Sequence, residues 1–262
     1  MQHKTTRPYP GPPRAAALSV LPLIMFCLAG TAAAAQDITR AELLQTLSAA
    51  QRGKPIKLTE IRLRHADLHG VDFKGANLRG ADFKGSNLSG ADFSGSNLDL
   101  AVLSRTNLSR ADLSHASLYG TVLVGADLSG ANLSGSHLVA NMRGAKLDGA
   151  DLSGAMAGAN MSNQSMALIR TSLKNASLVG TNLKNVNLKF CDARFANFVN
   201  ADLEGANLNT CDLRQANFSG SDLKGTDFSR SRLAGASFEG VRNRGAMVGL
   251  DSAEGVKEAK FD

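Results

Sequence analysis

The side chains of this sequence that could do chemistry recur at intervals of twenty residues. Cys191 and Cys211 are twenty residues apart, and two cysteines can form a disulfide when their Cα atoms come close enough. Lys174, Arg194 and Arg214 are spaced in the same way, and cations that gather on one surface attract anions. Both patterns have a chemical meaning only if the fold brings residues twenty apart together.

The remaining reactive side chains do not indicate catalysis or metal binding. The histidines are scattered, and serine is abundant only as a recurring filler of a repeat. No serine, histidine and acid arrangement can be argued, and a nucleophile needs a base within reach. We therefore predict that the chain is not an enzyme, binds no metal or cofactor and has no small-molecule substrate.

The N-terminus has the order of a secretory signal peptide. Residues 1–14 are polar and basic, residues 15–30 are apolar, and the small residues of TAAAAQ follow. We expect cleavage of residues 1–35 between Ala35 and Gln36, which predicts a periplasmic or secreted protein. Pro22 interrupts an apolar stretch that is short for a membrane span. An uncleaved membrane anchor is the alternative.

The charge balance disfavours nucleic acid as a partner. The formal net charge is +6, and Lys4, Arg7 and Arg14 of the expected signal peptide contribute three of the 29 basic residues. The mature chain would then carry 26 basic and 23 acidic residues, or +3. So mild a positive charge is weak evidence for a nucleic-acid partner.

A short helix is expected between the signal peptide and the repeats, within residues 36–55. Thr39 and Glu42 have capping-box spacing. Leu43, Leu44 and Leu47 follow on what we take as one helical face, so the pattern predicts an amphipathic helix over 38–52. Its apolar face would cover the open end of the domain that follows.

A strict period of five residues begins after this helix. Leu or Phe occupies every fifth position from Leu58 to Leu138. We call this the central position, i. A small residue usually precedes it at i−2, Asp or Asn at i−1, and Gly often follows at i+2. This period fits neither a helix nor an ordinary strand, and it indicates short extended segments joined by corners. One such unit cannot bury its Leu, whereas stacked coils can.

The period becomes irregular over 139–170. The unit centred on Met142 begins one residue early, and we read a four-residue unit at Ala155–Gly158. Met161 and Met166 are expected at central positions, and the original phase returns at Leu168. We expect the four methionines of this zone to soften the packing. Either a functional bulge or a tolerated insertion would explain the irregularity.

The repeated A-[D/N]-[L/F]-x-G unit, nearly pure over Ala66–Gly95, resembles the pentapeptide-repeat family across about 56–250. The resemblance implies an all-β fold: a right-handed quadrilateral β-helix solenoid with four units per coil, here with a short N-terminal capping helix. Residues at i and i−2 would face inward. The region 56–250 would form nine to ten coils. The segment 251–262 would be a polar C-terminal cap or a frayed end.

The resemblance also gives the spaced residues neighbours. Cys191 and Cys211 would lie inward on adjacent coils, where they are either a disulfide or small apolar fillers. Lys174, Arg194 and Arg214 would form a cationic ladder on one side, with Arg232 nearby. Because like charges repel, an anionic partner would relieve such a ladder; a merely solvated surface is the alternative.

These expectations favour a non-catalytic scaffold that presents flat faces to a macromolecule. The partner would be a protein or an anionic polymer of the cell envelope, and the oligomeric state is not predicted. The resemblance also implies an alternative, because some family members mimic DNA and bind a topoisomerase. Such mimicry needs acidic faces and a cytoplasmic location, and the basic charge and the export signal disfavour it.

Overall fold

The computed structural model describes residues 39–49, 56–158 and 170–262. The chain divides into two units, Met1–Ala32 and Ala33–Asp262, and all described residues belong to the second. The expected signal peptide and its cleavage point therefore lie outside the described residues, as do Met161, Met166 and Leu168.

The helix expected over 38–52 is α1, Arg40–Ala49. Its start is fixed by a capping box: the Thr39 N–H donates to Glu42 Oε2 at 2.8 Å, and the Glu42 N–H donates to Thr39 Oγ1 at 3.3 Å. Leu43 is fully buried in the same core as the coils, and Leu47 packs against it. Leu44 was wrongly placed on this face. It is 41% exposed, because a neighbour in sequence lies about 100° further round a helix.

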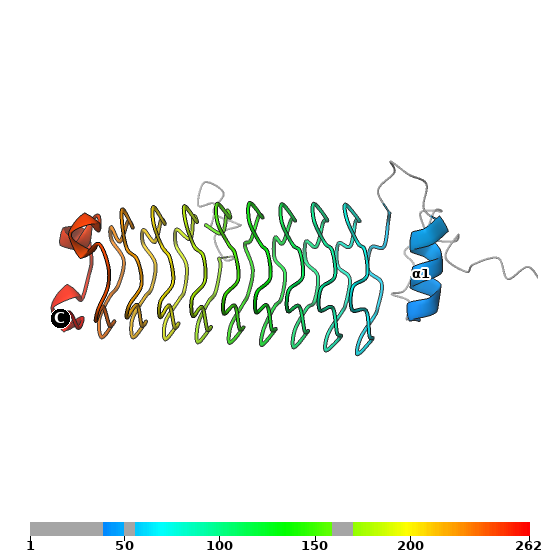
Figure 1. The fold of residues 1–262 in the computed structure, drawn as a ribbon, viewed down its shortest axis with the longest axis horizontal. Coiled ribbons are helices and arrows are strands. Elements are labelled where there is room, and N and C mark those ends of the chain that lie inside the picture. The colour runs from blue at the N-terminus through cyan, green and yellow to red at the C-terminus, as the bar shows by residue number, and fades with distance from the viewer. Residues whose placement is uncertain (1–38, 50–55, 159–169) are drawn as a thin grey trace, which may run out of the picture. The chain divides into compact units, whose positions relative to one another are not determined.

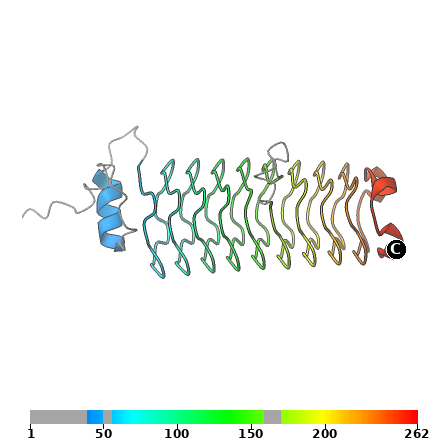
Figure 2. The same cartoon turned by 180° about the vertical axis from the view of Figure 1, so that it is seen from behind.

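The remaining described residues form coils that stack along one axis (Figures 1 and 2). Parallel β-bridges join residues twenty apart, such as Lys57 to Asn77 and Arg62 to Asp82. Four such columns of bridged residues run through the described coils, three with ten members and one with nine. The expected four units per coil and nine to ten coils are confirmed.

The core lies inside the coils because each unit turns its large and its small residue inward. Central residues such as Leu78 and i−2 residues such as Ala76 are fully buried. Phenylalanines twenty residues apart stack on one another inside the coils. Phe73 and Phe93 are parallel at 4.8 Å between ring centroids, and Phe218 stacks on Phe198 at 4.8 Å and on Phe238 at 5.1 Å.

The outer positions of the repeat are explained by the corners. The corner residue at i+2 has positive φ, for example 63° at Gly70, which glycine adopts without strain. The carboxylate or amide at i−1 accepts the backbone N–H of i+1, as Asp92 does from Ser94 at 2.8 Å. Asp and Asn recur at i−1 because they close the turn with this local hydrogen bond.

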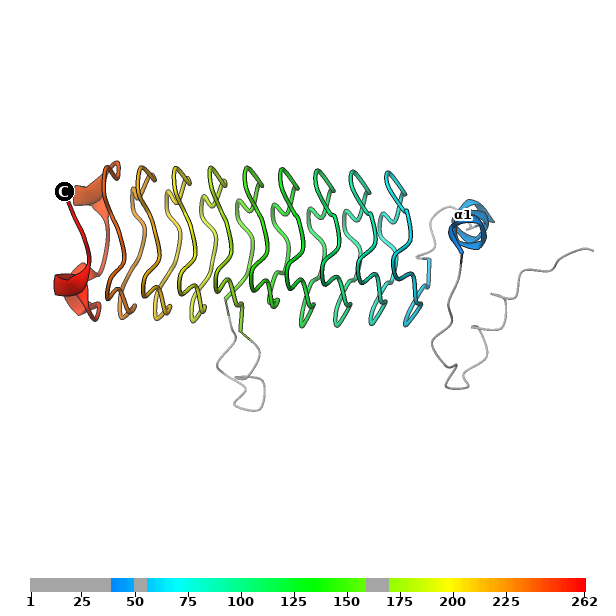
Figure 3. The same ribbon diagram turned by 90° about the horizontal axis from the view of Figure 1, so that it is seen from below.

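The irregular zone is a change of register within an unbroken stack. Asn141 bridges to Val122, nineteen residues earlier, and to Ser172, thirty-one residues later. The segment from Val122 to Asn141 is therefore one residue shorter than a regular coil. The segment from Asn141 to Ser172 is eleven residues longer than a regular coil. Figure 3 shows that the coils before and after this point continue along the same axis.

Two expectations for this zone are resolved in opposite ways. Met142 takes a central position and is fully buried, as predicted. The expectation that Met156 softens the packing was wrong, and the residues that would decide whether Ala155–Gly158 is a four-residue unit lie outside the described ones. Met156 stands at i−1, bridges to His137 and Asn187 and is 57% exposed, while Ala157 fills the central position. Met156 therefore does not soften the core.

The last coil is wider than the others. Bridges join Asp227 to Val248, Arg232 to Glu254 and Ser237 to Lys260, so the offset grows by one residue at each corner. These corners hold the 3-10 turns η3 (Arg244–Ala246), η4 (Leu250–Ser252) and η5 (Val256–Glu258). The expected C-terminal cap or frayed end, 251–262, thus pairs with the coil before it.

An aromatic and a cation close this end of the core. Phe261 stacks on Phe238 at 4.9 Å, and the Arg244 guanidinium lies 4.3 Å from the centroid of the Phe261 ring. A cation over an aromatic face is favourable, so Arg244 covers the last ring of the phenylalanine stack.

Candidate functional site

The structure brings the spaced cations onto one side of the coils. Parallel bridges run from Asn141 to Ser172, Asp192 and Asp212, so the units that contain them are consecutive rungs. We call the outer side of these units the cationic face. The i+1 residues of the four rungs form a cationic column: Arg143, Lys174, Arg194 and Arg214. The predicted residues Lys174, Arg194 and Arg214 are thus brought together, and Arg232 lies on the next rung.

Arg143 was missed by the sequence analysis. It lies thirty-one residues before Lys174, so a search at twenty-residue spacing cannot find it. The signal was nevertheless available, because Ala140–Gly144 reads as a complete unit and Arg143 stands in its i+1 slot. Comparing i+1 positions on either side of the change of register would have added Arg143 to the column.

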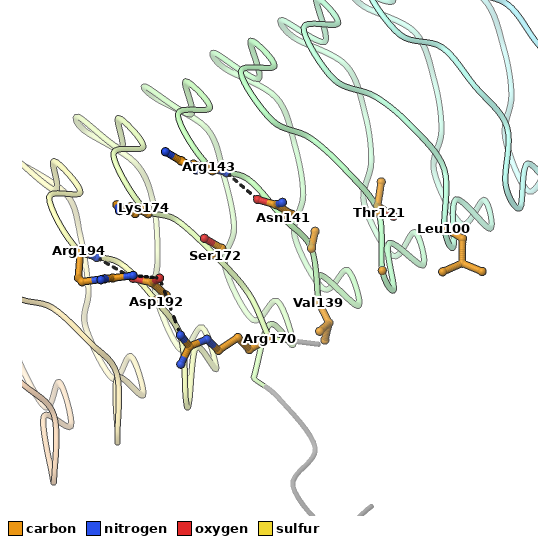
Figure 4. A pocket seen from close by; sticks show the side chains of 12 residues that line it. Leu100, Thr121, Val139, Asn141, Arg143, Arg170, Ser172, Lys174, Asp192 and Arg194 are labelled. Atoms are coloured by element: carbon orange, nitrogen blue, oxygen red, sulfur yellow. Dashed lines mark hydrogen bonds and ion pairs between the residues drawn. The ribbon is translucent and has the colours of Figure 1, made fainter. Parts of the chain in front are cut away.

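A groove of about 510 Å³ is hollowed into the cationic face (Figure 4). It spans five successive coils, from Leu100 through Thr121, Asn141 and Ser172 to Asp192. Its cause is the short corner at Val139. In the preceding coil, two residues, Tyr119 and Gly120, form this corner between Leu118 and Thr121. Here only Val139 separates Leu138 from Ala140. The corner is recessed by the missing residue, and Val139 is 2% exposed.

One carboxylate lies among the cations of the groove. Arg194 donates two hydrogen bonds to Asp192, from Nε at 2.9 Å and from a terminal nitrogen at 2.8 Å. Arg170 adds an ion pair at 3.9 Å. The bidentate bond from Arg194 holds the pKa of Asp192 below its ordinary value, although burial opposes the shift. Asp192 therefore stays ionised at neutral pH and compensates Arg194.

The same arrangement repeats one coil further along. Arg214 donates to Asp212 at 2.8 and 2.7 Å, and Arg194 and Arg232 approach the same carboxylate at 3.6 and 3.7 Å. Burial raises the pKa of Asp212, but the hydrogen bonds from Arg214 outweigh it and leave the pKa lowered. Arg194, Arg214 and Arg232 therefore already pair with carboxylates of the chain itself.

Positive charge is in surplus at the groove. Among the described residues, its lining carries four cations, Arg143, Arg170, Lys174 and Arg194, and one carboxylate, that of Asp192. Arg143 and Lys174 form no ion pair with any residue that the structure describes. Figure 4 shows Arg143 and Lys174 on neighbouring coils, on the far side of Asn141 and Ser172 from the recessed corner. This part of the face can take an anion without first breaking an internal ion pair.

The opposite side of the coils shows what a compensated ladder looks like. Lys184 and Lys224 both bind Glu204, at 3.2 and 2.7 Å, from the coils before and after it. Hydrogen bonds from Lys224 and Lys184 lower the pKa of Glu204. Signs therefore alternate from coil to coil there, while the cationic column carries one sign on four successive coils.

The two cysteines lie beneath the cationic face. Cys191 and Cys211 are both buried and are joined as a disulfide, with Cα atoms 4.6 Å apart. They occupy the i−2 positions of the rungs that carry Arg194 and Arg214. The bond ties together two coils whose outer sides share the Asp212 carboxylate.

The histidines do not converge on a site. His69 Nδ1 lies 2.9 Å from Asp67 Oδ1, and His137 stacks against Tyr119 at 5.9 Å between centroids. No group of three or more His, Cys, Asp or Glu that could hold a metal occurs within 39–49, 56–158 and 170–262. In the same ranges, α1 and the 3-10 turns are not of the length and apolarity that a membrane-crossing helix requires.

Comparisons with known proteins agree with the repeat. A family model described as "Pentapeptide repeats" matches residues 56–95, 96–135 and 140–166, and one described as "Pentapeptide repeat region" matches residues 161–238. No curated protein matches the chain.

Among solved structures, HetL resembles the chain at 29% identity and a TM-score of 0.37, covering 85% of this chain and 94% of HetL. HetL is a protein of the cyanobacterium Nostoc sp. involved in heterocyst differentiation regulation. QnrB1, a plasmid-mediated fluoroquinolone resistance protein, resembles it at 24% identity and a TM-score of 0.44, covering 79% of this chain and 93% of QnrB1. Likeness at this level carries no argument about function.

Proposed function

Because the chain belongs to the pentapeptide-repeat family, we propose that it is a non-catalytic binding scaffold, exported from the cytoplasm, whose cationic face holds an anionic macromolecule. The observation that carries the proposal is the cationic column. Four successive coils present a cation from the same slot, and two of the four, Arg143 and Lys174, have no acidic partner among the described residues.

The geometry suits binding better than catalysis. The central and i−2 side chains fill the interior of the coils, so the outward residues lie on long sides at fixed spacing. Such a surface offers many similar contacts rather than a few convergent groups in a deep pocket. Export is supported by the order of residues 1–35. The DNA-mimicking alternative gains no support from the face described here, because mimicry of DNA requires an acidic surface.

Location is tested by fractionating cells that express the full chain with a C-terminal tag and by mass spectrometry of its N-terminus. We expect a soluble periplasmic or secreted product that begins near Gln36. An intact N-terminus in the cytoplasm would refute export, and an intact N-terminus in the membrane fraction would make residues 15–30 an anchor.

Binding through the cationic face is tested by site-specific photo-cross-linking. A photoreactive residue is placed at Ser172, inside the groove, or at Asn182, which occupies the same slot of the same coil on the opposite side. We expect adducts with a macromolecule from position 172 and few from position 182. Equal labelling from both positions would refute the assignment of the binding face.

A further inference from the structure

We propose that the groove holds the acyl chain of an anionic lipid, with the head group at Arg143 and Lys174 and the chain running along the axis toward Leu100. The inference rests on the proposed function, and it names the part of the anionic macromolecule that the groove binds. It is carried by apolar residues at positions where the fold favours other types, by the two cations without an acidic partner, and by a surface that offers a peptide no hydrogen bonds.

The first observation is a pair of valines on the cationic face, on the coils that precede the cations. Val102 bridges to Val122, and Val122 bridges to Asn141, so both valines stand at i−1. Asp or Asn at this position accepts the backbone N–H of i+1, as Asn141 does from Arg143 at 3.3 Å. A valine side chain has no acceptor, so Val102 and Val122 leave that turn bond unmade. The local structure of the repeat therefore gives no reason for valine at either position.

A third aliphatic residue continues this apolar surface into the groove. Leu100 occupies a corner with a φ of 61°, a conformation that favours glycine, and it is 47% exposed. It lines the groove together with Gly120 and Val139. Val124, at i+1 of the rung that holds Val122, is half-buried on the same face. Such a surface favours an apolar chain, because the chain removes apolar area from water.

The second observation is the change in character of this face along the axis. The i+1 residue is Val124 on one rung, and it is Arg143 and then Lys174 on the next two. Neither cation forms an ion pair with a residue that the structure describes. Outside the described ranges, residues 50–55 and 159–169 contain no Asp or Glu. The face is therefore apolar at one end of the groove and carries uncompensated positive charge at the other.

Hydrogen-bonding groups lie beside these two cations. Asn141 and Ser172 line the groove between the recessed corner and the cations (Figure 4), where their side chains can bind head-group oxygens. Arginine and lysine both bind the oxygens of carboxylates and phosphates. Arg194 is not needed, because Asp192 already accepts two of its hydrogen bonds. The head group is therefore assigned to the coils of Asn141 and Ser172 alone.

The third observation decides between a lipid and a peptide. The backbone groups of the apolar rungs already bond to neighbouring coils: the Val122 N–H donates to the Ala101 carbonyl at 2.9 Å, and the Leu103 N–H donates to the Val122 carbonyl at 2.8 Å. The valine and leucine side chains add no donor or acceptor. A peptide lying there would lose the hydration of its own N–H and C=O groups without replacement, which is costly. An acyl chain carries no such groups, so the apolar end favours a lipid.

The apolar part of the face has a definite end. Val102 bridges on its other side to Asp82, which accepts a hydrogen bond from Arg64 at 2.7 Å. An acyl chain that extended beyond Val102 would meet this ion pair instead of an apolar surface. We therefore expect the gain in affinity from a longer chain to level off.

The test compares unbranched carboxylates of increasing length, acetate, octanoate and dodecanoate, with dodecyltrimethylammonium as a cation of matched chain. Binding to the full chain, as recovered from the fractionated cells, is measured by ligand-observed NMR below the concentrations at which micelles form. A fully buried methylene contributes about fourfold in affinity, and an open groove covers about half of each, so we expect about twofold per methylene up to octanoate and less beyond. The cation should bind about tenfold more weakly than dodecanoate.

Two matched pairs of substitutions test the apolar end. Val102→Asn with Val122→Asn removes both valines and supplies the missing turn acceptors. Met156→Asn with Val248→Asn makes the same change at apolar i−1 positions on another side of the coils. We expect the first pair to weaken dodecanoate binding about tenfold and the second less than about twofold. The new turn hydrogen bonds offset the lost valine contact, so the urea midpoint of the first pair should stay close to that of the parent chain.

A second comparison tests the head-group end. Arg143→Ala with Lys174→Ala removes both uncompensated cations, whereas Lys74→Ala with Arg79→Ala removes two exposed i+1 cations from other sides of the coils. Each exposed ion pair contributes modestly, so we expect the first pair to weaken dodecanoate binding about tenfold and the second less than about twofold. The first pair should also make the remaining binding less sensitive to salt.

Three results would overturn the inference. The first is an affinity that does not rise with chain length, and the second is an equal loss from the two asparagine pairs. The third is a urea midpoint that falls far more for the pair at 102 and 122 than for its control, which would assign the valines to the fold. Absence of dodecanoate binding together with protein adducts from position 172 would assign the groove to a protein partner. The proposed function fails separately, if the chain is not exported or if cross-links do not favour the cationic face.

Discussion

The phenylalanine stack makes a quantitative prediction about what holds the coils together. Phe218 is fully buried between Phe198 and Phe238, and its ring meets that of Phe228 edge-on at 5.6 Å. Truncating a buried Phe to Ala typically costs about 3–5 kcal/mol, and aromatic pairs contribute about 0.5–1.5 kcal/mol each beyond their burial. Because Phe218 makes three such pairs, we expect Phe218→Ala to lower the free energy of unfolding by about 4–5 kcal/mol.

Two further substitutions calibrate this value. Phe218→Leu keeps an apolar side chain in a column where Leu178 already fills the same place two coils earlier. We therefore expect a loss of about 1.5 kcal/mol or less. Phe195→Ala removes the same side chain from an exposed corner, where the expected change is within about 0.5 kcal/mol.

The assay is urea unfolding combined with native-state hydrogen exchange. A solenoid is stabilised by neighbouring repeats, so a local defect opens its own coils first. Amides of the coils around residues 198–238 should lose protection in Phe218→Ala, while those around residues 68–108 should keep it. A loss below about 1.5 kcal/mol, or equal losses from Phe218→Ala and Phe195→Ala, would refute the reasoning from ring stacking.

Three smaller predictions follow from contacts at other places. Arg244→Ala uncovers the Phe261 ring, so hydrogen exchange should show faster opening of the last coil, by about 0.5–1 kcal/mol for an exposed cation over a ring. Cys211→Ser removes the disulfide that links residues twenty apart, which should lower the free energy of unfolding by about 3 kcal/mol. The new serine hydroxyl can donate to the Leu188 carbonyl oxygen, which lies 2.9 Å from Sγ in the parent chain, and this should restore about 1 kcal/mol. Urea unfolding should therefore show a net loss of about 2 kcal/mol, and a reductant should destabilise only the parent chain. The pKa of Asp192 is lowered in the folded chain, so its ion pairs stabilise the fold above the ordinary aspartate pKa of about 3.9 and stop doing so as pH falls through the lowered value. The stability difference between the parent chain and Asp192→Asn should therefore be present at pH 7 and vanish in strong acid; a difference independent of pH would contradict the assignment.

Most of the fold could be predicted from the sequence because the five-residue period states which residues face inward. The central Leu and Phe, the small i−2 residues and the stacks such as Phe198 on Phe218 all follow from it. The period also locates the shortened corner, because the unit centred on Met142 begins one residue early, as the bridge from Val122 to Asn141 confirms. It does not tell which methionines of the irregular zone reach the core, and Met156 stands at i−1 and is exposed.

The candidate site could be predicted only in part. The shared slot of Lys174, Arg194 and Arg214 was visible, but Arg143 was hidden by the change of register. The carboxylates that compensate Arg194 and Arg214 stand two residues before them, and nothing in the pattern tells whether such neighbours pair with each other or with solvent. The groove depends on a missing residue at a corner, which the early start of the unit centred on Met142 does mark, but the period does not tell that a shortened corner leaves a hollow beside the cations.

The widened last coil limits how molecules can associate end to end. A regular coil advances twenty residues per circuit, whereas the bridge offset in the last circuit grows to twenty-three. A second molecule whose first coil has regular sides cannot continue all four columns across that junction, because the corners no longer superimpose. With Arg244 also covering the last ring, this face differs from the regular coils both in its register and in the charged group that lies over its core.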